Sequence, residues 1–410
     1  MNDQRPTALA GSRAANIVDP TSQSAWIKLS MLSNGVTISP GFSSWFDAQL
    51  RYVRRRNFYN SPGAAFKGSS PPQEIRIADV IPITVAVNNY GRPVWELSLD
   101  PEQRPLIVST ELGISKYAEL LYDLTATSDE PELARLCNLY GGSALSFFSP
   151  RACYFFADGT ECRFCSLAGT AIESDEFASR LTPSDIEQSV SAVVYQDSEL
   201  LTQIMIVGGN ERNLDRGFLH QVALVRAASN ALHRAGLADR VSVHLIVMPP
   251  RNLKLIEELR NVTNLHVGFN LEVWDPDRFD NIAPGKRNDY GQDEILTALV
   301  RLRDIVGPYR AHSILIAGLE PPQSTIEGAK ALAEQGISPI INAYHSDRHS
   351  AIGLSIRPNY QHLAEVAVGL QALHDKYPIE PYWSGCGRNA LDFEAANGMF
   401  RGNAPNLEVG

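Results

Sequence analysis

From about Gly141 to Tyr377 the chain alternates short apolar runs with longer helical patterns, and this alternation limits its possible folds more than any other feature. The apolar runs are Ala144–Ser149, Gln203–Gly208, Ser242–Val247, His266–Leu271, His312–Ala317 and Ser338–Ala343. A helical pattern follows each run, so every unit is predicted to be a strand and then a helix. Repeated units of this kind form a parallel sheet with helices packed against it.

The helical patterns carry their own start and stop signals. Thr182-Pro183 supplies an N-cap and a proline at the first helical position. The pattern from Ser324 to Gln335 ends before a glycine, and the pattern from about Asn359 to Lys376 keeps its apolar residues on one face. Right-handed crossovers curl such a sheet, so we predict the α/β class with a partial (βα)6 TIM-type barrel. Its chemistry is expected at the carboxyl ends of the strands.

The remaining segments predict three further parts around a barrel of residues 141–377. Residues 1–24 are polar and are expected to be disordered, residues 25–140 to form an α+β domain, and residues 378–410 to extend over the barrel mouth. In the α+β domain we expect strands at Ile81–Val87, Val94–Leu97 and Leu106–Ser109, and helices near Ile114–Thr125 and Pro131–Tyr140.

Charge and composition exclude some classes of partner. The formal net charge is −10 and the pI is near 5.4, which argues against nucleic acid because a phosphate backbone requires a basic face. No run of about 18 apolar residues is present, so no membrane span is expected. Five cysteines are too few for a disulfide framework, and the polar N-terminus lacks the apolar part of a signal peptide. We therefore expect a reducing, cytoplasmic location.

Three of the cysteines cluster in a loop after the first apolar run. Eight residues separate Cys153 from Cys162, and two separate Cys162 from Cys165. Three thiolates are one short of a closed zinc site, whereas an iron–sulfur cluster with three protein ligands leaves one iron open. A zinc site completed by a histidine, or simply buried thiols, are the alternatives that this segment leaves open.

With the motifs that follow it, this segment resembles the radical S-adenosylmethionine superfamily, over about residues 141–377. In that family three cysteines follow the first barrel strand and an aromatic residue precedes the last, as Phe164 does here. The first gap, of eight residues, is longer than is usual in the family. The resemblance implies a 4Fe–4S cluster on Cys153, Cys162 and Cys165.

Three later motifs also resemble the family and imply contacts with S-adenosylmethionine. Gly208, Gly209 and Asn210 match the site of its amino group, and Asn270 with Glu272 match the pair that binds its ribose hydroxyls. In the segment Pro284-Gly285-Lys286-Arg287, we favour Arg287 for its carboxylate because a guanidinium binds carboxylates bidentately. The residues that match the adenine-binding motif of the fifth strand are Ile316, Gly318 and Glu320.

The resemblance implies that the cofactor is cleaved reductively to a 5′-deoxyadenosyl radical, which abstracts hydrogen from a small-molecule substrate. Rearrangement, epimerisation or other carbon-centred radical chemistry would follow, in an oxygen-sensitive enzyme. A reductase, flavodoxin or ferredoxin would supply the electron. Only Cys137 and Cys386 lie outside the triad, too few for a second full cluster. The rivals are a zinc-dependent barrel hydrolase, with His244 and His312 as candidate ligands, and a non-catalytic iron–sulfur sensor or binding protein.

Two further loops are candidates for the substrate site. Tyr344, His345 and Arg348 follow the sixth run. The second loop is the glycine-containing segment from Tyr382 to Asn389 near the C-terminus, which includes Cys386 and Arg388. A polar loop after a strand is as often solvated as functional. The Cys386 thiol is a hypothetical catalytic hydrogen-atom donor to a substrate radical; a small buried residue is the alternative.

Overall fold

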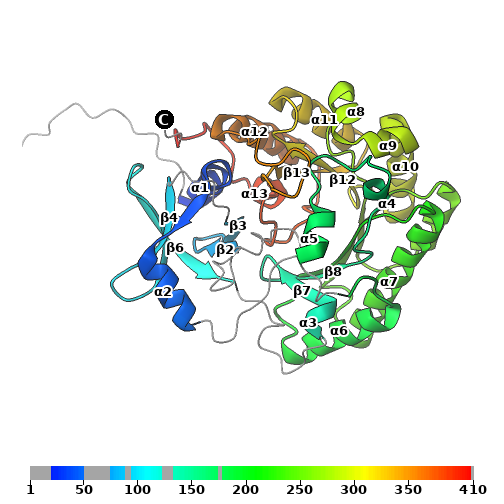
Figure 1. Ribbon diagram of the computed structural model, residues 1–410, viewed down its shortest axis with the longest axis horizontal. Helices are drawn as coiled ribbons and strands as arrows, with labels where there is room; N and C mark the ends of the chain where they lie inside the picture. The colour runs from blue at the N-terminus through cyan, green and yellow to red at the C-terminus, as the bar shows by residue number, and fades with distance from the viewer. Residues whose placement is uncertain (1–19, 50–73, 88–93, 122–132, 174–177, 408–410) are drawn as a thin grey trace, which may run out of the picture.

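A computed structural model describes residues 20–49, 74–87, 94–121, 133–173 and 178–407, and Figure 1 shows two sheets in them. The larger sheet has seven strands in the order β13-β12-β11-β10-β9-β8-β7. Its strands are β7 (Cys137–Tyr140), β8 (Ala144–Phe148), β9 (Gln203–Val207), β10 (Ser242–Ile246), β11 (Leu265–Gly268), β12 (Ala311–Ala317) and β13 (Ser338–Ala343). Strands β8 to β13 are all parallel. The predicted partial barrel is confirmed, and all six apolar runs form strands.

Helices cover the outer face of this sheet (Figure 1). They are α6 (Pro183–Gln196), α7 (Leu214–Arg234), the 3-10 helix η2 (Leu253–Leu259), α10 (Gly291–Val306), α11 (Pro322–Glu334) and α12 (Tyr360–Lys376). Thr182 and Asp185 form a reciprocal capping box at the start of α6, and the Asn359 side chain caps α12. The start signal predicted at Thr182-Pro183 is therefore confirmed, because the cap satisfies backbone N–H groups that the first helical turn leaves unpaired.

Strand β7 corrects the prediction of a helix near Pro131–Tyr140. Of the described residues in this range, Leu133–Leu136 are helical (α3), and Cys137–Tyr140 pairs antiparallel with β8. Gly141 and Gly142 form the turn between the two strands at positive φ, a conformation that glycine adopts readily. All four β7 residues are buried, so their pattern carries no strand alternation. The sheet therefore begins before residue 141.

The smaller sheet has the order β1-β4-β5-β6-β2-β3. Its strands are β1 (Val36–Ile38), β2 (Glu74–Ile77), β3 (Ile83–Ala86), β4 (Trp95–Leu99), β5 (Pro105–Ser109) and β6 (Ile114–Leu120), and its helices are α1 (Pro20–Asn34) and α2 (Pro40–Gln49). The prediction of a helix near Ile114–Thr125 is wrong. Ile114–Leu120 is a strand, in which the even-numbered residues are less exposed than the odd-numbered ones. Helix α1 begins before residue 24, and residues 1–19 lie outside the described part.

The segment after α12 lies between the two edge strands of the barrel sheet. Ala343 N–H donates to Asn389 O at 2.8 Å and Leu391 N–H donates to Ile341 O at 2.9 Å, which pairs this segment with β13. At the other edge, the Trp383 ring stacks on Tyr140 of β7 at 4.9 Å between centroids. The C-terminal segment therefore covers the open side of the half-barrel, whereas the sequence placed it over the mouth.

Two buried ion pairs fasten the smaller domain to this segment. Lys28 Nζ of α1 lies 2.6 Å from Glu394 of α13 (Asp392–Ala396), and it also donates to Gly387 O and Ala390 O at 2.7 Å. Arg388 pairs with Glu74 of β2 at 2.8 Å. Both cations are buried, so each pair is stable only with both partners present.

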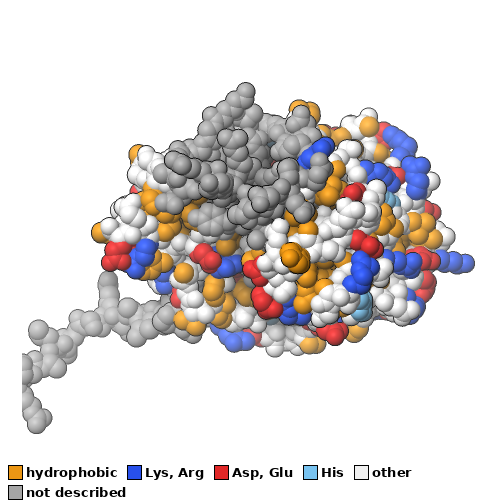
Figure 2. All heavy atoms as spheres, turned by 90° about the horizontal axis from the view of Figure 1, so that it is seen from below, with side chains coloured by type: hydrophobic (Ala, Val, Ile, Leu, Met, Phe, Trp, Pro, Cys, Tyr) orange, Lys and Arg blue, Asp and Glu red, His pale blue; other side chains and the backbone are white. Residues whose placement is uncertain are grey.

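Charged side chains of both signs lie on the face of the molecule drawn in Figure 2. On the face drawn in Figure 2, basic and acidic side chains are interspersed over the described elements, without one continuous basic field. In the described ranges, none of the helices is both long and apolar enough to cross a membrane.

We predict that Lys28→Met destabilises the protein by about 3–5 kcal/mol, because the variant leaves Glu394 buried without its partner. The shift in thermal midpoint measures this loss. The matched control is Arg226→Met, which breaks the exposed pair with Glu258 and is expected to cost at most about 1 kcal/mol. Equal thermal midpoints for the two variants would contradict the fastening role of Lys28.

Candidate functional site

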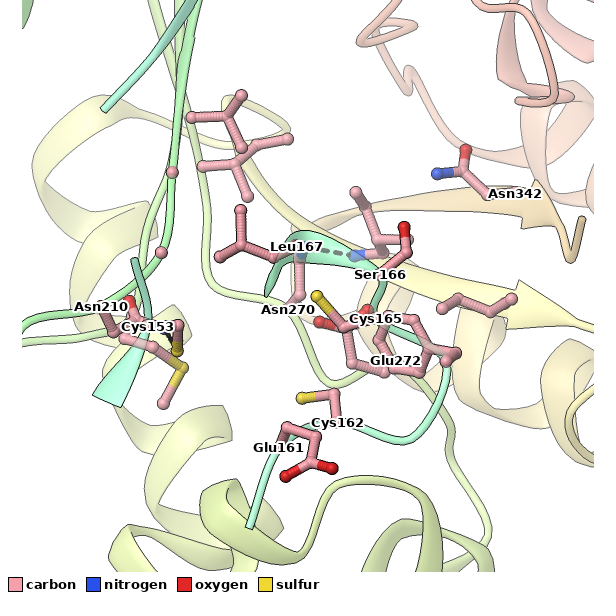
Figure 3. A pocket seen from close by; sticks show the side chains of 18 of the residues that line it. Cys153, Glu161, Cys162, Cys165, Ser166, Leu167, Asn210, Asn270, Glu272 and Asn342 are labelled. Carbon is pink, nitrogen blue, oxygen red and sulfur yellow. Dashed lines mark hydrogen bonds between the residues drawn. The ribbon is translucent and has the colours of Figure 1, made fainter. Parts of the chain in front are cut away.

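A cavity of about 260 Å³ opens at the carboxyl ends of the barrel strands and contains most of the predicted site residues (Figure 3). Those that line it are Cys153, Cys162, Phe164, Cys165, Gly208, Gly209, Asn210, Asn270, Glu272, Ile316, Tyr344 and His345. They come from five loops or strand ends that are distant in sequence. A parallel sheet brings these strand ends together at one edge.

The long gap between the first two cysteines is accommodated by a single helical turn. Cys153 is the N-cap of α4 (Tyr154–Ala157), and Gly159 follows at φ 66°. Thr160 N–H then donates to Phe155 O at 2.8 Å, which folds the chain back toward its start. Cys165 N–H donates to Cys162 O at 2.9 Å. The eight-residue spacing thus returns the second and third cysteines to the cavity that the first one lines.

Glycines fix this cysteine loop against its neighbours. A Cβ on Gly208 would lie 2.2 Å from Ser149 O, and one on Gly209 would lie 2.2 Å from Ala152 O. On the other side, a Cβ on Gly285 would lie 2.6 Å from Thr160 O. Contacts below 3.0 Å force atoms to shift, so these glycines allow the loop to lie close to the turn after β9 and to the helix α9 (Pro284–Asp289).

The thiols surround the cavity and do not meet at a single point. In Figure 3, Cys162 and Cys165 lie near each other, while Cys153 lies apart, with Asn210 Nδ2 3.7 Å from its sulfur. No three His, Cys, Asp or Glu side chains of the described ranges are close enough to share one metal ion. Three separated thiols that face one cavity fit a multinuclear cluster better than a single ion.

In the absence of a cation, burial favours the protonated forms of Cys162 and Cys165. It raises the pKa of Cys165 to about 12 and raises the pKa of Cys162 as well, although the Lys286 ammonium opposes the latter shift. A bound metal centre reverses this balance because it stabilises thiolates directly.

Lys286, and not Arg287, is the basic residue of the cavity. Lys286 Nζ lies 2.5 Å from Glu272 Oε1 and donates to Asn270 O at 2.7 Å. Burial favours the neutral amine, but the charge of Glu272 and its hydrogen bond outweigh this effect and raise the pKa of Lys286. Arg287 is exposed and pairs with Asp280 at 2.9 Å. The preference for Arg287 is therefore corrected: adjacent residues of α9 (Pro284–Asp289) point in different directions, and residue chemistry alone does not show which one faces inward.

Glu272 also has an unusual backbone. Its φ is 73°, a left-handed conformation that is uncommon for a residue with a side chain. Glu272 N–H donates to Ile314 O at 2.8 Å, and Ile316 N–H donates to Glu272 O at 2.7 Å. These bonds to β12 hold the conformation and keep the carboxylate beside Lys286. Such strained residues cluster at functional sites.

Three other predicted residues lie outside the cavity. Gly318 has φ 105° and faces Pro358. The Glu320 carboxylate accepts hydrogen bonds from the backbone N–H groups of Trp274 and Asp275 at 2.8 Å, so it shapes the loop after β11. Arg348 is exposed, with Nε 3.1 Å from His349. Of the predicted adenine motif, only Ile316 lines the cavity.

Cys386 and Arg388 are also corrected. The Cys386 sulfur lies 3.4 Å from Gln203 Oε1, at the first residue of β9, and the residue is fully buried outside the cavity lining. The cysteine loop follows the carboxyl end of the neighbouring strand, β8. Since a five-residue strand is about 13 Å long, roughly this distance separates the amino end of β9, where Cys386 lies, from the cysteine loop. Arg388 is buried in its pair with Glu74. Neither side chain reaches the space above the strands.

The barrel histidines do not support the hydrolase alternative. The His266 and His312 rings, near the amino ends of β11 and β12, share a hydrogen bond of 2.9 Å. His244 stacks on His266 at 4.6 Å, and Tyr382 packs edge-on against His244 and His312. Burial lowers the pKa of all three histidines, so they are neutral core residues.

Several residues that line the cavity lie outside the sequence motifs. These are Tyr140, Met205, Ile246 and Asn342. The strand residues among them follow the inward alternation of each strand, which is the one signal that could have identified them. Trp383 and Asn389 belong to the glycine-containing segment that the sequence indicated as a candidate, and they reach the cavity through the path of that segment.

Comparisons with known proteins give one similar curated protein and several similar structures. The chain is 27% identical over 237 residues to bacteriochlorophyllide c C-7(1)-hydroxylase of Chlorobaculum limnaeum, which covers 56% of each chain. The chain thus spans about half the length of that relative. No protein-family model matches the sequence.

Among solved structures, a radical SAM methyltransferase from Sphaerobacter thermophilus is 14% identical, with a TM-score of 0.43 over 72% of this chain and 79% of that one. Coproporphyrinogen III oxidase from Escherichia coli, a radical SAM enzyme, is 16% identical, with a TM-score of 0.35 over 60% of this chain and 54% of that one. The resemblance to the radical S-adenosylmethionine superfamily therefore rests on the sequence motifs.

Proposed function

We propose that this protein is a radical S-adenosylmethionine enzyme that holds a 4Fe–4S cluster on Cys153, Cys162 and Cys165 and abstracts hydrogen from a small-molecule substrate. The observation that carries the proposal is the placement of three thiols around one cavity beside the Glu272–Lys286 pair. A donor set of three leaves one iron of such a cluster open to a further ligand. Bound there, the cluster and S-adenosylmethionine would supply reductive cleavage of the sulfonium bond and a 5′-deoxyadenosyl radical.

The chain's own residues have distinct roles in this proposal. The cysteines bind the cluster, and the loop contacts of Gly208, Gly209 and Gly285 hold them in position. Two of the three N–H donors of Lys286 are engaged by Asn270 and Glu272, so the third is left for the cofactor carboxylate. Asn270 and Glu272 line the cavity next to it, where they can accept hydrogen bonds from ribose hydroxyls.

The substrate chemistry and the partners are also part of the proposal. The curated relative is named for hydroxylation at a carbon, and this supports chemistry at a C–H bond. Cleavage of the cofactor requires one electron, so we include a reductase, flavodoxin or ferredoxin as electron donor. A reducing cytoplasm would suit a cluster bound by thiolates, and we expect sensitivity to oxygen.

We predict that Cys153→Ala, Cys162→Ala and Cys165→Ala each abolish the broad absorbance near about 400 nm of anaerobically reconstituted protein, since each removes a cluster ligand. Iron and sulfide analysis gives the stoichiometry, with about four irons expected in the wild type. Cys137→Ala is the matched control, because Cys137 is buried in β7 outside the cavity lining. Full iron binding by Cys153→Ala would contradict the assignment of the first ligand.

We predict that Lys286→Met weakens S-adenosylmethionine binding by about 10–100-fold, the effect of losing one hydrogen bond to a charged group. Arg287→Met is the matched control and should bind the cofactor like the wild type, since Arg287 faces solvent. Equilibrium dialysis with labelled cofactor measures both variants. An equal loss in both would contradict the role of Lys286.

A third prediction separates the enzyme from a non-catalytic sensor. The dithionite-reduced protein should form 5′-deoxyadenosine from S-adenosylmethionine, slowly in the absence of substrate. Chromatography of the quenched reaction measures this product, and electron paramagnetic resonance verifies that the cluster is reduced. A reduced cluster without 5′-deoxyadenosine would favour the sensor.

A further inference from the structure

The part of the cavity lining that comes from β7, β13 and the C-terminal segment has a composition of its own. We call it the recognition wall and define it by Tyr140 of β7, Asn342 of β13, and Trp383 and Asn389 of the C-terminal segment. These residues meet because the C-terminal segment pairs with β13 on one side and contacts β7 on the other. The wall therefore exists only in the assembled half-barrel.

The wall presents two aromatic rings held in fixed positions. Trp383 and Tyr140 stack with an interplanar angle of 24°. The Trp383 backbone N–H donates to Asp392 at 3.1 Å, and Gly387 lies so close that a Cβ there would be 2.8 Å from the indole. Both rings are buried, and in the described ranges the Trp383 Nε1–H has no partner. Rigid aromatic surfaces of this kind bind flat apolar groups.

Beside the rings, two carboxamides supply the polar part of the wall. The Asn342 side chain makes no hydrogen bond within the described residues; its Oδ1 is buried, and Figure 3 shows its amide nitrogen turned toward the other lining side chains. Asn389 Nδ2 donates to Ala343 O at 3.0 Å, which fixes that amide. An unpaired buried carboxamide is costly, and a carboxamide can both donate and accept. A ligand with both functions on one edge would satisfy Asn342.

The recognition wall carries no formal charge. The charged residues of the cavity are Glu161, Glu272 and Lys286, of which the last two pair with each other. Behind Tyr140, the Arg388 guanidinium lies 5.3 Å from the ring centroid, but Glu74 neutralises it at 2.8 Å. An ionised ligand group at the wall would be buried without a counter-charge, which is strongly unfavourable.

From these three properties, we propose that the recognition wall binds the substrate and that the substrate is an uncharged, flat ring system with an amide-like edge, an N–H beside a C=O, as in a lactam. Asn342 is the specificity-determining residue, since it pairs with that edge while the rings of Trp383 and Tyr140 hold the body of the ligand. The inference rests on the proposed function for the placement of the cofactor at the other end of the cavity.

The first test uses 2-quinolone, a neutral bicyclic lactam, as the probe in calorimetric titrations of the reconstituted full chain. We expect saturable binding of 2-quinolone about ten-fold tighter than that of 1-methyl-2-quinolone, which lacks the N–H donor. The anion quinoline-2-carboxylate should bind more weakly than either. Absence of saturable 2-quinolone binding, equal binding of the three compounds, or preference for the anion would overturn the proposal.

The second test reverses the preference by a single substitution. Asn342→Asp places a carboxylate at the same position, and it should prefer protonated 2-aminoquinoline, whose two parallel N–H donors match a carboxylate at about pH 6. Asn342→Leu should lose the about ten-fold advantage of 2-quinolone over its methyl derivative. Asn397→Asp is the matched control, because Asn397 is exposed and outside the cavity lining, and it should keep the wild-type order. A misfolded variant cannot produce a reversed order.

Iron content and S-adenosylmethionine binding, measured on the same samples, distinguish the two proposals. If Asn342→Asp keeps normal iron content and cofactor binding and also keeps the wild-type order of affinities for the probes, the recognition wall alone would be overturned. Loss of iron and cofactor binding in the wild type, with the 2-quinolone preference intact, would overturn the proposed function and leave the recognition wall standing.

Discussion

The organisation of this protein depends on how the two open edges of a curled seven-stranded sheet are covered. A sheet that does not close on itself leaves unpaired backbone groups along β7 and β13. Here the C-terminal segment pairs with β13 through Asn389 and Leu391 and contacts β7 through Trp383. The same segment is anchored by Lys28 and Glu74, so the smaller domain stabilises the closure from outside. Covering the edges also creates one wall of the cavity.

The cavity is divided between two chemical environments. At the strand ends, thiols and the Glu272–Lys286 pair gather on loops, and their charges compensate one another in a buried space. Opposite them lie aromatic rings and carboxamides without formal charge. This arrangement suits a site in which a charged cofactor and a neutral substrate meet, and it supports the proposed radical enzyme more directly than a hydrolase. The neutral histidine layer near the amino ends of β11 and β12 has a structural role.

The cysteine loop shows how an unusual spacing can serve a common purpose. One turn of helix and a glycine at positive φ take up the residues between Cys153 and Cys162. Gly208 and Gly209, which are predicted to contact a ligand, also allow the turn after β9 to lie close to the backbone of the cysteine loop. The physical requirement is the close approach of two backbones, and glycine alone permits it at these distances.

The sequence by itself determined the periodic part of this protein. Alternating runs fixed β8 to β13, and the Thr182-Pro183 cap fixed the start of α6. The order of the motifs identified the residues that line one site, namely Cys153, Cys162, Cys165, Asn270 and Glu272, because these signals are local. Only the tertiary structure decided whether Lys286 or Arg287 faces the cavity. It also showed that Cys386 and Arg388 are buried away from the cavity, and that Trp383 lies beside Tyr140. Each of those outcomes depends on which face of an element is covered by a segment far away in sequence, and no residue pattern encodes that contact.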